Sequence, residues 1–92
     1  MTSLQGYVEA SFDELVEAFG EPTYTEPSGD GKVETEWEIM DDDTVCTIYD
    51  WKEYDNGARS RSGLAYRWHI GGRNREAVDV VSNRLNKLAY YA

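Results

Sequence analysis

The sequence has one cysteine, one histidine and no long hydrophobic run, and each of these scarcities excludes a class of protein. Cys46 has no second cysteine to pair with, which excludes an internal disulfide and fits a reducing compartment. No apolar run approaches the ~18–20 residues of a membrane-spanning helix. Residues 1–5 have neither the basic region nor the apolar stretch of a signal peptide. We therefore expect a cytoplasmic protein.

The chain is also poor in metal ligands and catalytic groups. With a single cysteine and a single histidine, a zinc site built only from protein ligands is not expected. The aspartates at 41–43 do not have the ~12-residue span of a calcium loop and are typical of a solvated hairpin turn. Cys46, His69 and Asp50 are the residue types of a nucleophile, a base and an orienting group, but a half-buried structural His69 is the ordinary outcome in an alternating strand. We therefore expect no enzyme, no metal and no cofactor.

The composition is that of one folded domain spanning residues 1–92. Hydrophobic residues make up 40% and charged residues 29% of the chain, and a disordered chain would have far fewer aromatics. A domain of this size buries only about 60–65% of the surface of its unfolded chain, so its core must be economical. Three Trp, seven Tyr and two Phe supply that core in large pieces.

Two segments have the spacing of helices. Ser11 and Glu14 form a capping box ahead of an apolar pattern, which predicts a helix over residues 12–19. Gly20 suits the left-handed position that follows the last helical turn, and Pro22 prevents the helix from continuing. A second helix is predicted from about residue 74 to residue 90. Its apolar stripe consists of Ala77, Val78, Val81, Leu85 and Leu88.

Four segments are predicted to form strands: residues 6–10, 32–40, 44–51 and 64–70. The second strand alternates apolar with polar residues, as half-buried antiparallel strands do. The third is apolar on both faces, which favours a central place in the sheet. Gly71 and Gly72 are expected to break the last strand. The order β-α-β-β-β-α predicts an α+β fold, with an antiparallel sheet of three to four strands and both helices packed on one face.

Negative charge is concentrated in the first part of the chain. Residues 1–55 hold 16 of the 18 acids and only two bases, a net charge of −14. Residues 56–92 carry a net charge of +5, which leaves −9 for the whole chain. Such asymmetry indicates either an electrostatic partner or neutralisation of one half of the fold by the other.

The acidic side chains of the second predicted strand form a ladder. Glu34, Glu36 and Glu38 share one strand face, where carboxylates recur about every 6.5–7 Å, an interval similar to that of phosphates along a DNA strand. We expect these carboxylates to face solvent and to titrate normally. The hairpin residues Asp41, Asp42 and Asp43 extend the ladder into an acidic ridge.

Two interpretations of the acidic ridge stay open. In the first, the ridge is an ordinary solvated face, partly paired with Arg67 at little gain in stability. In the second, it mimics nucleic acid and binds the basic surface of a protein that handles nucleic acid, while Trp51 or Tyr54 supplies an apolar anchor. The second is favoured by the stability cost of placing so many like charges together. Direct binding of nucleic acid by Arg59, Arg61, Arg73 and Arg75 is disfavoured by the overall charge.

Three strings carry a resemblance to known proteins. The string FGEP at 19–22, IYDWK at 48–52 and WHIGG at 68–72 resemble those of small acidic proteins encoded by bacteriophages, over about residues 6–90. The resemblance implies a viral product that acts in the cytoplasm of an infected bacterial cell, and it implies nothing about catalysis. Small acidic phage proteins are often inhibitors of host machinery, CRISPR–Cas effectors included.

The leading hypothesis is therefore a phage-encoded inhibitor that occupies the nucleic-acid-binding surface of a host protein, with a CRISPR–Cas effector as the first target class. One alternative is a structural module that self-associates, for example as a homodimer, through Tyr90, Tyr91 and the last helix. Another is a pocket for a small anionic ligand, such as a nucleotide, at the corner formed by residues 68–72.

Overall fold

The computed structural model describes residues 3–25, 35–41, 43–51 and 63–91, with side chains described as far as Lys87 in the last helix. Its elements, in chain order, are β1 (Ser3–Ala10), α1 (Phe12–Phe19), β2 (Glu36–Asp41), β3 (Thr44–Tyr49), β4 (Tyr66–Gly72) and α2 (Glu76–Tyr91). The predicted order of strands and helices is confirmed.

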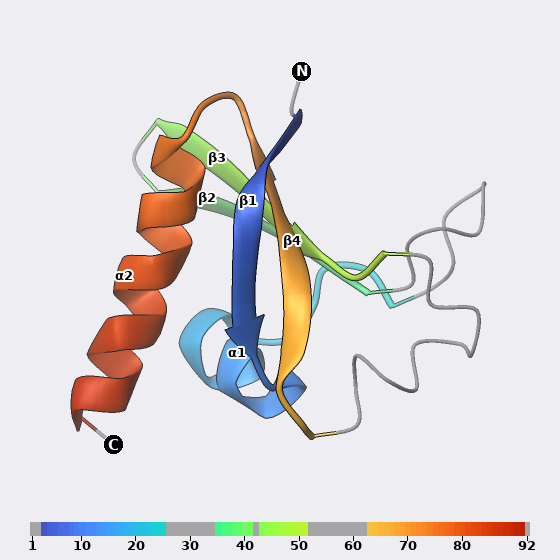
Figure 1. Cartoon of the computed structure of the whole chain (residues 1–92), viewed down its shortest axis with the longest axis vertical. Helices are drawn as coiled ribbons and strands as arrows, with labels where there is room; N and C mark the ends of the chain where they lie inside the picture. Colours follow the sequence, from blue (N-terminus) through green and yellow to red (C-terminus); the bar gives the residue numbers. More distant parts are fainter. Residues whose placement is uncertain (1–2, 26–34, 42, 52–62, 92) are drawn as a thin grey trace.

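The four strands form one antiparallel sheet in the order β1-β4-β3-β2. The central place predicted for residues 44–51 is confirmed, since β3 lies between β4 and β2. Both helices pack on the same face of the sheet, with α2 lying over β1, β3 and β4 and contacting α1 (Figure 1). The fold is therefore the predicted α+β arrangement of one sheet with two helices on one side.

Helix α1 has the residue range that its local sequence predicts. The Ser11 hydroxyl accepts a hydrogen bond from the Glu14 backbone N–H at 3.1 Å, and the Glu14 carboxylate accepts one from the Ser11 N–H at 2.9 Å. At the other end Gly20 has a φ of 84°, as expected, but its ψ of −170° is extended rather than left-handed helical. The chain therefore leaves the helix at once and runs towards the sheet.

Two buried tryptophans hold α1 against the sheet. Trp37 and Trp68 meet edge to face with ring centroids 5.3 Å apart. The Trp68 indole N–H donates to the carbonyl of Ala10 at 2.9 Å, just before the helix. The Trp37 indole N–H donates to the carbonyl of Gly20 at 2.8 Å, just after it. The core aromatics thus fix both ends of α1 with their polar atoms and fill the interior with their rings.

The glycine pair at the end of β4 does not break the strand, contrary to the prediction. Gly71 and Gly72 continue the ladder, pairing with β1 and with Thr47 and Cys46 of β3. The physical reason is tertiary, because a Cβ on Gly72 would lie 2.5 Å from Cβ of Ala77 in α2. Glycine here lets the helix approach the sheet, and the turn falls on residues 73–75, after which α2 begins.

The other strand boundaries also differ from those predicted. β1 begins at Ser3, three residues earlier than expected, and contains an irregularity between Leu4 and Gly6. β2 begins at Glu36 and continues to Asp41, whereas the alternation predicted residues 32–40. Residues 32–34, the first three of that predicted strand, lie outside the described residues.

Candidate binding site on the open face of the sheet

The face of the sheet opposite the two helices is covered by no helix or strand of the described residues, and we call it the open face. Backbone register places one residue of each strand in a row across it: Tyr7 pairs with His69, His69 with Tyr49, and Tyr49 with Glu36. The open face therefore presents three aromatic rings side by side with a carboxylate at the edge.

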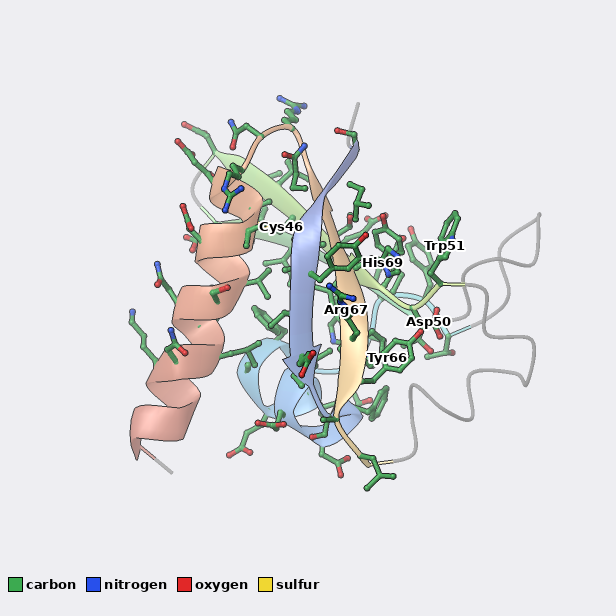
Figure 2. All side chains as sticks on the ribbon, in the orientation of Figure 1. Cys46, Asp50, Trp51, Tyr66, Arg67 and His69 are labelled. Carbon is green, nitrogen blue, oxygen red and sulfur yellow. The ribbon has the colours of Figure 1, made fainter. Side chains whose placement is uncertain are left out.

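His69 lies at the centre of an aromatic cluster, which consists of Tyr7, Tyr49, Trp51 and His69. Its ring centroid is 5.0 Å from that of Tyr7, 5.4 Å from that of Tyr49 and 5.8 Å from that of Trp51. The guanidinium carbon of Arg67 lies 4.4 Å from the centre of the Tyr7 ring, in cation–π geometry. Figure 2 shows Arg67, His69 and Trp51 gathered on the side of the sheet away from α2.

The surroundings of His69 lower its pKa from the ordinary value of 6.5. Burial among the rings is the largest cause and the charge of Arg67 adds to it, while Asp50 opposes both. The Nδ1 atom is buried and finds no hydrogen-bond partner within the described part of the chain. At neutral pH the imidazole is therefore uncharged and acts as a stacking ring.

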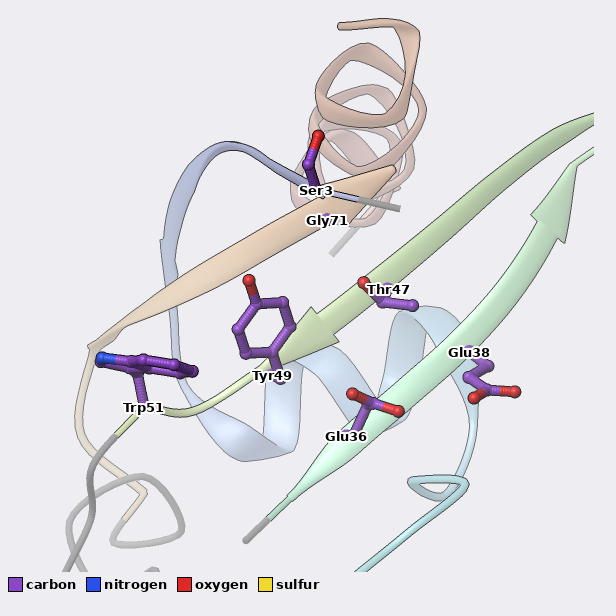
Figure 3. A pocket seen from close by; sticks show the side chains of 7 residues that line it. All are labelled: Ser3, Glu36, Glu38, Thr47, Tyr49, Trp51 and Gly71. Carbon is purple, nitrogen blue, oxygen red and sulfur yellow. The ribbon is translucent and has the colours of Figure 1, made fainter. Parts of the chain in front are cut away.

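Beside the aromatic cluster the open face is hollowed. The hollow has a volume of about 310 Å³. Its lining residues are Ser3, Glu36, Glu38, Thr47, Tyr49, Trp51 and Gly71. In Figure 3 the rings of Trp51 and Tyr49 stand towards one end and the carboxylates of Glu36 and Glu38 lie along β2. The hollow thus combines aromatic walls with two negative charges.

Glu36 does not titrate normally, contrary to the prediction for the ladder. Its side chain is half-buried, and its pKa is raised from 4.5, first by burial and then by the charge of Glu38. No Lys or Arg among residues 3–25, 35–41, 43–51 and 63–87 forms an ion pair with either carboxylate. Glu36 is therefore an acid whose charge is poorly compensated within the described structure.

The structure brings together part of the predicted acidic ladder. Glu36 and Glu38 share the open face, as alternation predicted, while Glu34 lies outside the described residues. The next position on this face is Met40, whose side chain is 70% exposed. The ladder is therefore interrupted by an apolar residue before the hairpin is reached.

The hairpin aspartates do not simply extend the ladder. Strand alternation turns Asp41 towards the helix-covered face, where its charge raises the pKa of the buried Cys46 thiol. Asp43 is exposed at the turn, and Asp42 lies outside the described residues. Of the two predicted anchors, Trp51 is 38% exposed and borders the hollow, while Tyr54 lies outside the described residues.

The sequence prediction missed several residues of this site. Tyr7, Thr47 and Tyr49 were not assigned to any site, and His69 and Gly71 were placed only in the alternative pocket for an anionic ligand at residues 68–72. Period-two alternation against buried neighbours nevertheless places all five on the same strand faces. Alternation alone shows which residues of one strand share a face. The row across four strands also requires the register of β1 on β4 and of β4 on β3, which is set by contacts distant in the sequence.

The catalytic set considered from the sequence is not assembled. Cys46 is fully buried on the helix-covered face, whereas His69 lies on the open face (Figure 2). The pKa of Cys46 is raised from 9.0, mainly by burial, with Asp41 adding to the shift and Arg84 opposing it. Asp50 is buried and accepts a hydrogen bond from the Thr35 backbone N–H at 3.0 Å. Cys46 and Asp50 are therefore buried among groups of the fold, and neither is placed to react together with His69.

The described part of the chain has neither a metal-binding cluster nor a membrane-spanning helix. Among the described residues, no three side chains of His, Cys, Asp or Glu gather closely enough to hold a metal ion. No helix there has both the length and the apolar character needed to cross a membrane.

Comparison with family models, curated proteins and solved structures gives no match to this chain. The resemblance to bacteriophage proteins therefore stays a prediction.

Proposed function

We propose that the protein is a binding protein that docks the open face of its sheet onto the basic surface of a partner protein. The observation that carries this proposal is the aromatic cluster standing beside Glu36 and Glu38 on a sheet face that no described element covers. The aromatic rings would supply contact area, and the carboxylates would select a partner of positive charge.

The rings on the open face have the properties of interface anchors. Tyr7 is 44% and Trp51 38% exposed, so both offer apolar surface to a partner while one side stays packed on the sheet. Their positions are held by His69 and Tyr49, so that little side-chain entropy is left to lose on binding. Met40, on the same face of β2, adds an exposed apolar side chain of a type enriched in interfaces.

Charge supports a basic partner. The chain has a net charge of −9, which would speed encounter with a positively charged surface and discourage contact with nucleic acid itself. Basic surfaces of this kind are typical of proteins that bind nucleic-acid phosphates. The partner we propose is therefore a host protein that handles nucleic acid, and the resemblance to phage proteins makes a CRISPR–Cas effector the first one to test.

The test is a competition between this protein and DNA for a purified CRISPR–Cas effector. The open-face variant Glu36→Lys/Glu38→Lys is compared with a matched control, Glu17→Lys/Glu21→Lys, which reverses two exposed glutamates away from the open face. We expect the wild type and the control to displace DNA, and the open-face variant to be weaker by at least about tenfold, because each close charge pair lost at an interface costs more than 1 kcal/mol.

Circular dichroism and thermal unfolding must show that all three proteins are folded. Equal loss of displacement in both variants would mean that only net charge matters, which would contradict docking through the open face. Undiminished displacement by the open-face variant would contradict it as well.

Two alternatives receive less support. An anionic ligand near residues 68–72 would meet a hollow lined by Glu36 and Glu38, which would repel it. The side chains of Tyr90 and Tyr91, proposed for self-association, lie outside the described residues.

A further inference from the structure

We infer that the hollow on the open face is a pocket for the guanidinium group of one arginine side chain presented by the partner protein. This inference rests on the proposed function and names the group that the site would recognise. Three properties of the hollow support it: its size, its aromatic and hydroxyl-bearing walls, and its two acidic side chains.

The size fits a single side chain. At about 310 Å³ the hollow lies at the lower end of the ~300–1,000 Å³ typical of small-molecule sites. Its floor is kept open by Gly71, because a Cβ at that position would collide with the Thr47 hydroxyl. At this position a group entering from solvent would therefore meet the backbone of β4 and the Thr47 hydroxyl rather than a side chain of residue 71.

The walls favour a planar cation. Trp51 and Tyr49 present aromatic rings whose centroids are 6.3 Å apart and whose planes are inclined by 65°. A guanidinium group stacks on such rings and gains from their negative faces. The hydroxyls of Thr47 and Ser3, which also line the hollow, can accept hydrogen bonds from its remaining N–H groups.

The two carboxylates favour the binding of a positively charged group. Glu36 and Glu38 are two residues apart on β2, so their side chains stand about 7 Å apart along the strand. Glu36 is half-buried, and its charge is disfavoured by that burial and by Glu38. Arg67, on the same face, stacks on Tyr7 at the far side of His69, so these acids have no compensating cation among the residues that the structure describes. An incoming guanidinium would compensate both, and it could bind one carboxylate through two parallel hydrogen bonds.

The experiment is a titration of the full chain, labelled with ¹⁵N, with N-acetylarginine amide. The readout is the indole N–H signal of Trp51. Trp37 and Trp68 serve as internal references because their rings are fully buried and their indole groups bond to Gly20 and Ala10. The matched neutral probe is N-acetylcitrulline amide, which has nearly the same shape without the charge. The matched variants are Glu36→Gln/Glu38→Gln in the pocket and Glu17→Gln/Glu21→Gln away from it.

We expect a saturable shift of the Trp51 signal with a dissociation constant on the order of 1 mM, as befits a small probe. The citrulline probe should give no saturable shift. The pocket variant should bind the arginine probe at least about fivefold more weakly, because its charge-assisted hydrogen bonds are lost. The other variant should bind it as the wild type does.

Three results would overturn the inference: an equal response to citrulline, an equal loss in both variants, or no shift at Trp51. The variant Arg59→Gln/Arg61→Gln tests whether an arginine of the same chain fills the pocket. If only this variant binds the probe, the pocket is already filled internally and the inference of an external arginine is wrong.

The failure of this inference and the failure of the proposed function are distinguishable. Binding of the arginine probe without displacement of DNA from any partner would sustain the pocket and contradict the docking function. Displacement that depends on Glu36 and Glu38 without probe binding would sustain docking and contradict the arginine pocket.

Discussion

Tyr49 and His69 lie directly opposite each other on β3 and β4, with ring centroids 5.4 Å apart and ring planes inclined by 30°. Because Tyr7 and Trp51 flank the same imidazole, His69 joins residues from three parts of the chain into one aromatic surface. The packing of these rings exists before any partner arrives. The open face is therefore a preorganised surface rather than one that must form on binding.

The first prediction concerns the pH dependence of stability. The folded-state pKa of His69 is lowered, so the stabilisation from keeping the ring neutral is complete above pH 6.5 and is lost as the pH falls through 6.5 towards the folded-state value. His69→Phe retains a ring but cannot titrate. We expect its melting temperature to fall less than that of the wild type between pH 7.5 and 5.5.

His69 is the only histidine of the chain, so no other side chain of ordinary pKa titrates in that window. A proton NMR titration of the imidazole measures the shift directly. A midpoint at or above 6.5, or identical pH dependence in the variant, would contradict the assigned burial of this ring.

The second prediction concerns Glu36. Since its folded-state pKa is raised from 4.5, the ionised side chain destabilises the fold, and this penalty is complete above the raised pKa and vanishes as the pH falls below 4.5. Glu36→Gln should raise the free energy of unfolding at pH 7 by roughly 0.2–1 kcal/mol, a small gain because solvent screens a half-exposed group. A gain of ~1 kcal/mol would raise the melting temperature by about 4–8 °C.

Denaturant unfolding at pH 7 and pH 4 measures this effect. The gain from Glu36→Gln should shrink at the lower pH, while the exposed control Glu17→Gln should show little change at either pH. Destabilisation of Glu36→Gln at pH 7 would show that the carboxylate has a compensating partner.

The third prediction tests why glycine occupies position 71. Gly71→Ala places a Cβ against the Thr47 hydroxyl and should cost about 1–3 kcal/mol. Thr47→Ala removes that hydroxyl, so the double variant should recover part of the loss. The coupling energy of this cycle should be at least ~0.5 kcal/mol. Additive effects of the two substitutions would mean that Thr47 is not what restricts the position.

The fourth prediction concerns Cys46, whose thiol is fully buried and whose pKa is raised mainly by that burial. Because the thiolate is the reactive species, a disulfide reagent such as DTNB should modify the native protein at least about a hundredfold more slowly than the denatured protein. Cys46 reacting as fast in native buffer as in guanidinium would contradict its place under α2.

The sequence was most informative where the determinants are local. The capping box of Ser11 and Glu14 and the stop at Gly20 define α1 without help from the rest of the fold. Alternation likewise assigned Glu36 and Glu38 to one face and Trp37 to the other. Such patterns depend only on the geometry of a single helix or strand.

The sequence was least informative where the structure depends on contacts between segments that are distant in the chain. Gly71 and Gly72 have the composition of a turn, yet they extend β4 because Thr47 and Ala77 approach them from β3 and α2. The aromatic cluster depends on the same kind of contact, since Tyr7 reaches His69 only through the register of β1 on β4. Strand register of this kind is a property of the assembled sheet and cannot be obtained from one segment.

The central claim is that the open face contacts the partner, and an NMR footprint of the complex tests it most directly. The ¹⁵N-labelled protein is titrated with the nucleic-acid-binding domain of the protein whose DNA it displaces. We expect the signals of Tyr7, Thr47, Tyr49 and the Trp51 indole to shift or broaden, while those of Asp79, Asn83 and Asn86 on the exposed side of α2 stay unchanged. A footprint confined to α2, with the open face unperturbed, would contradict the account.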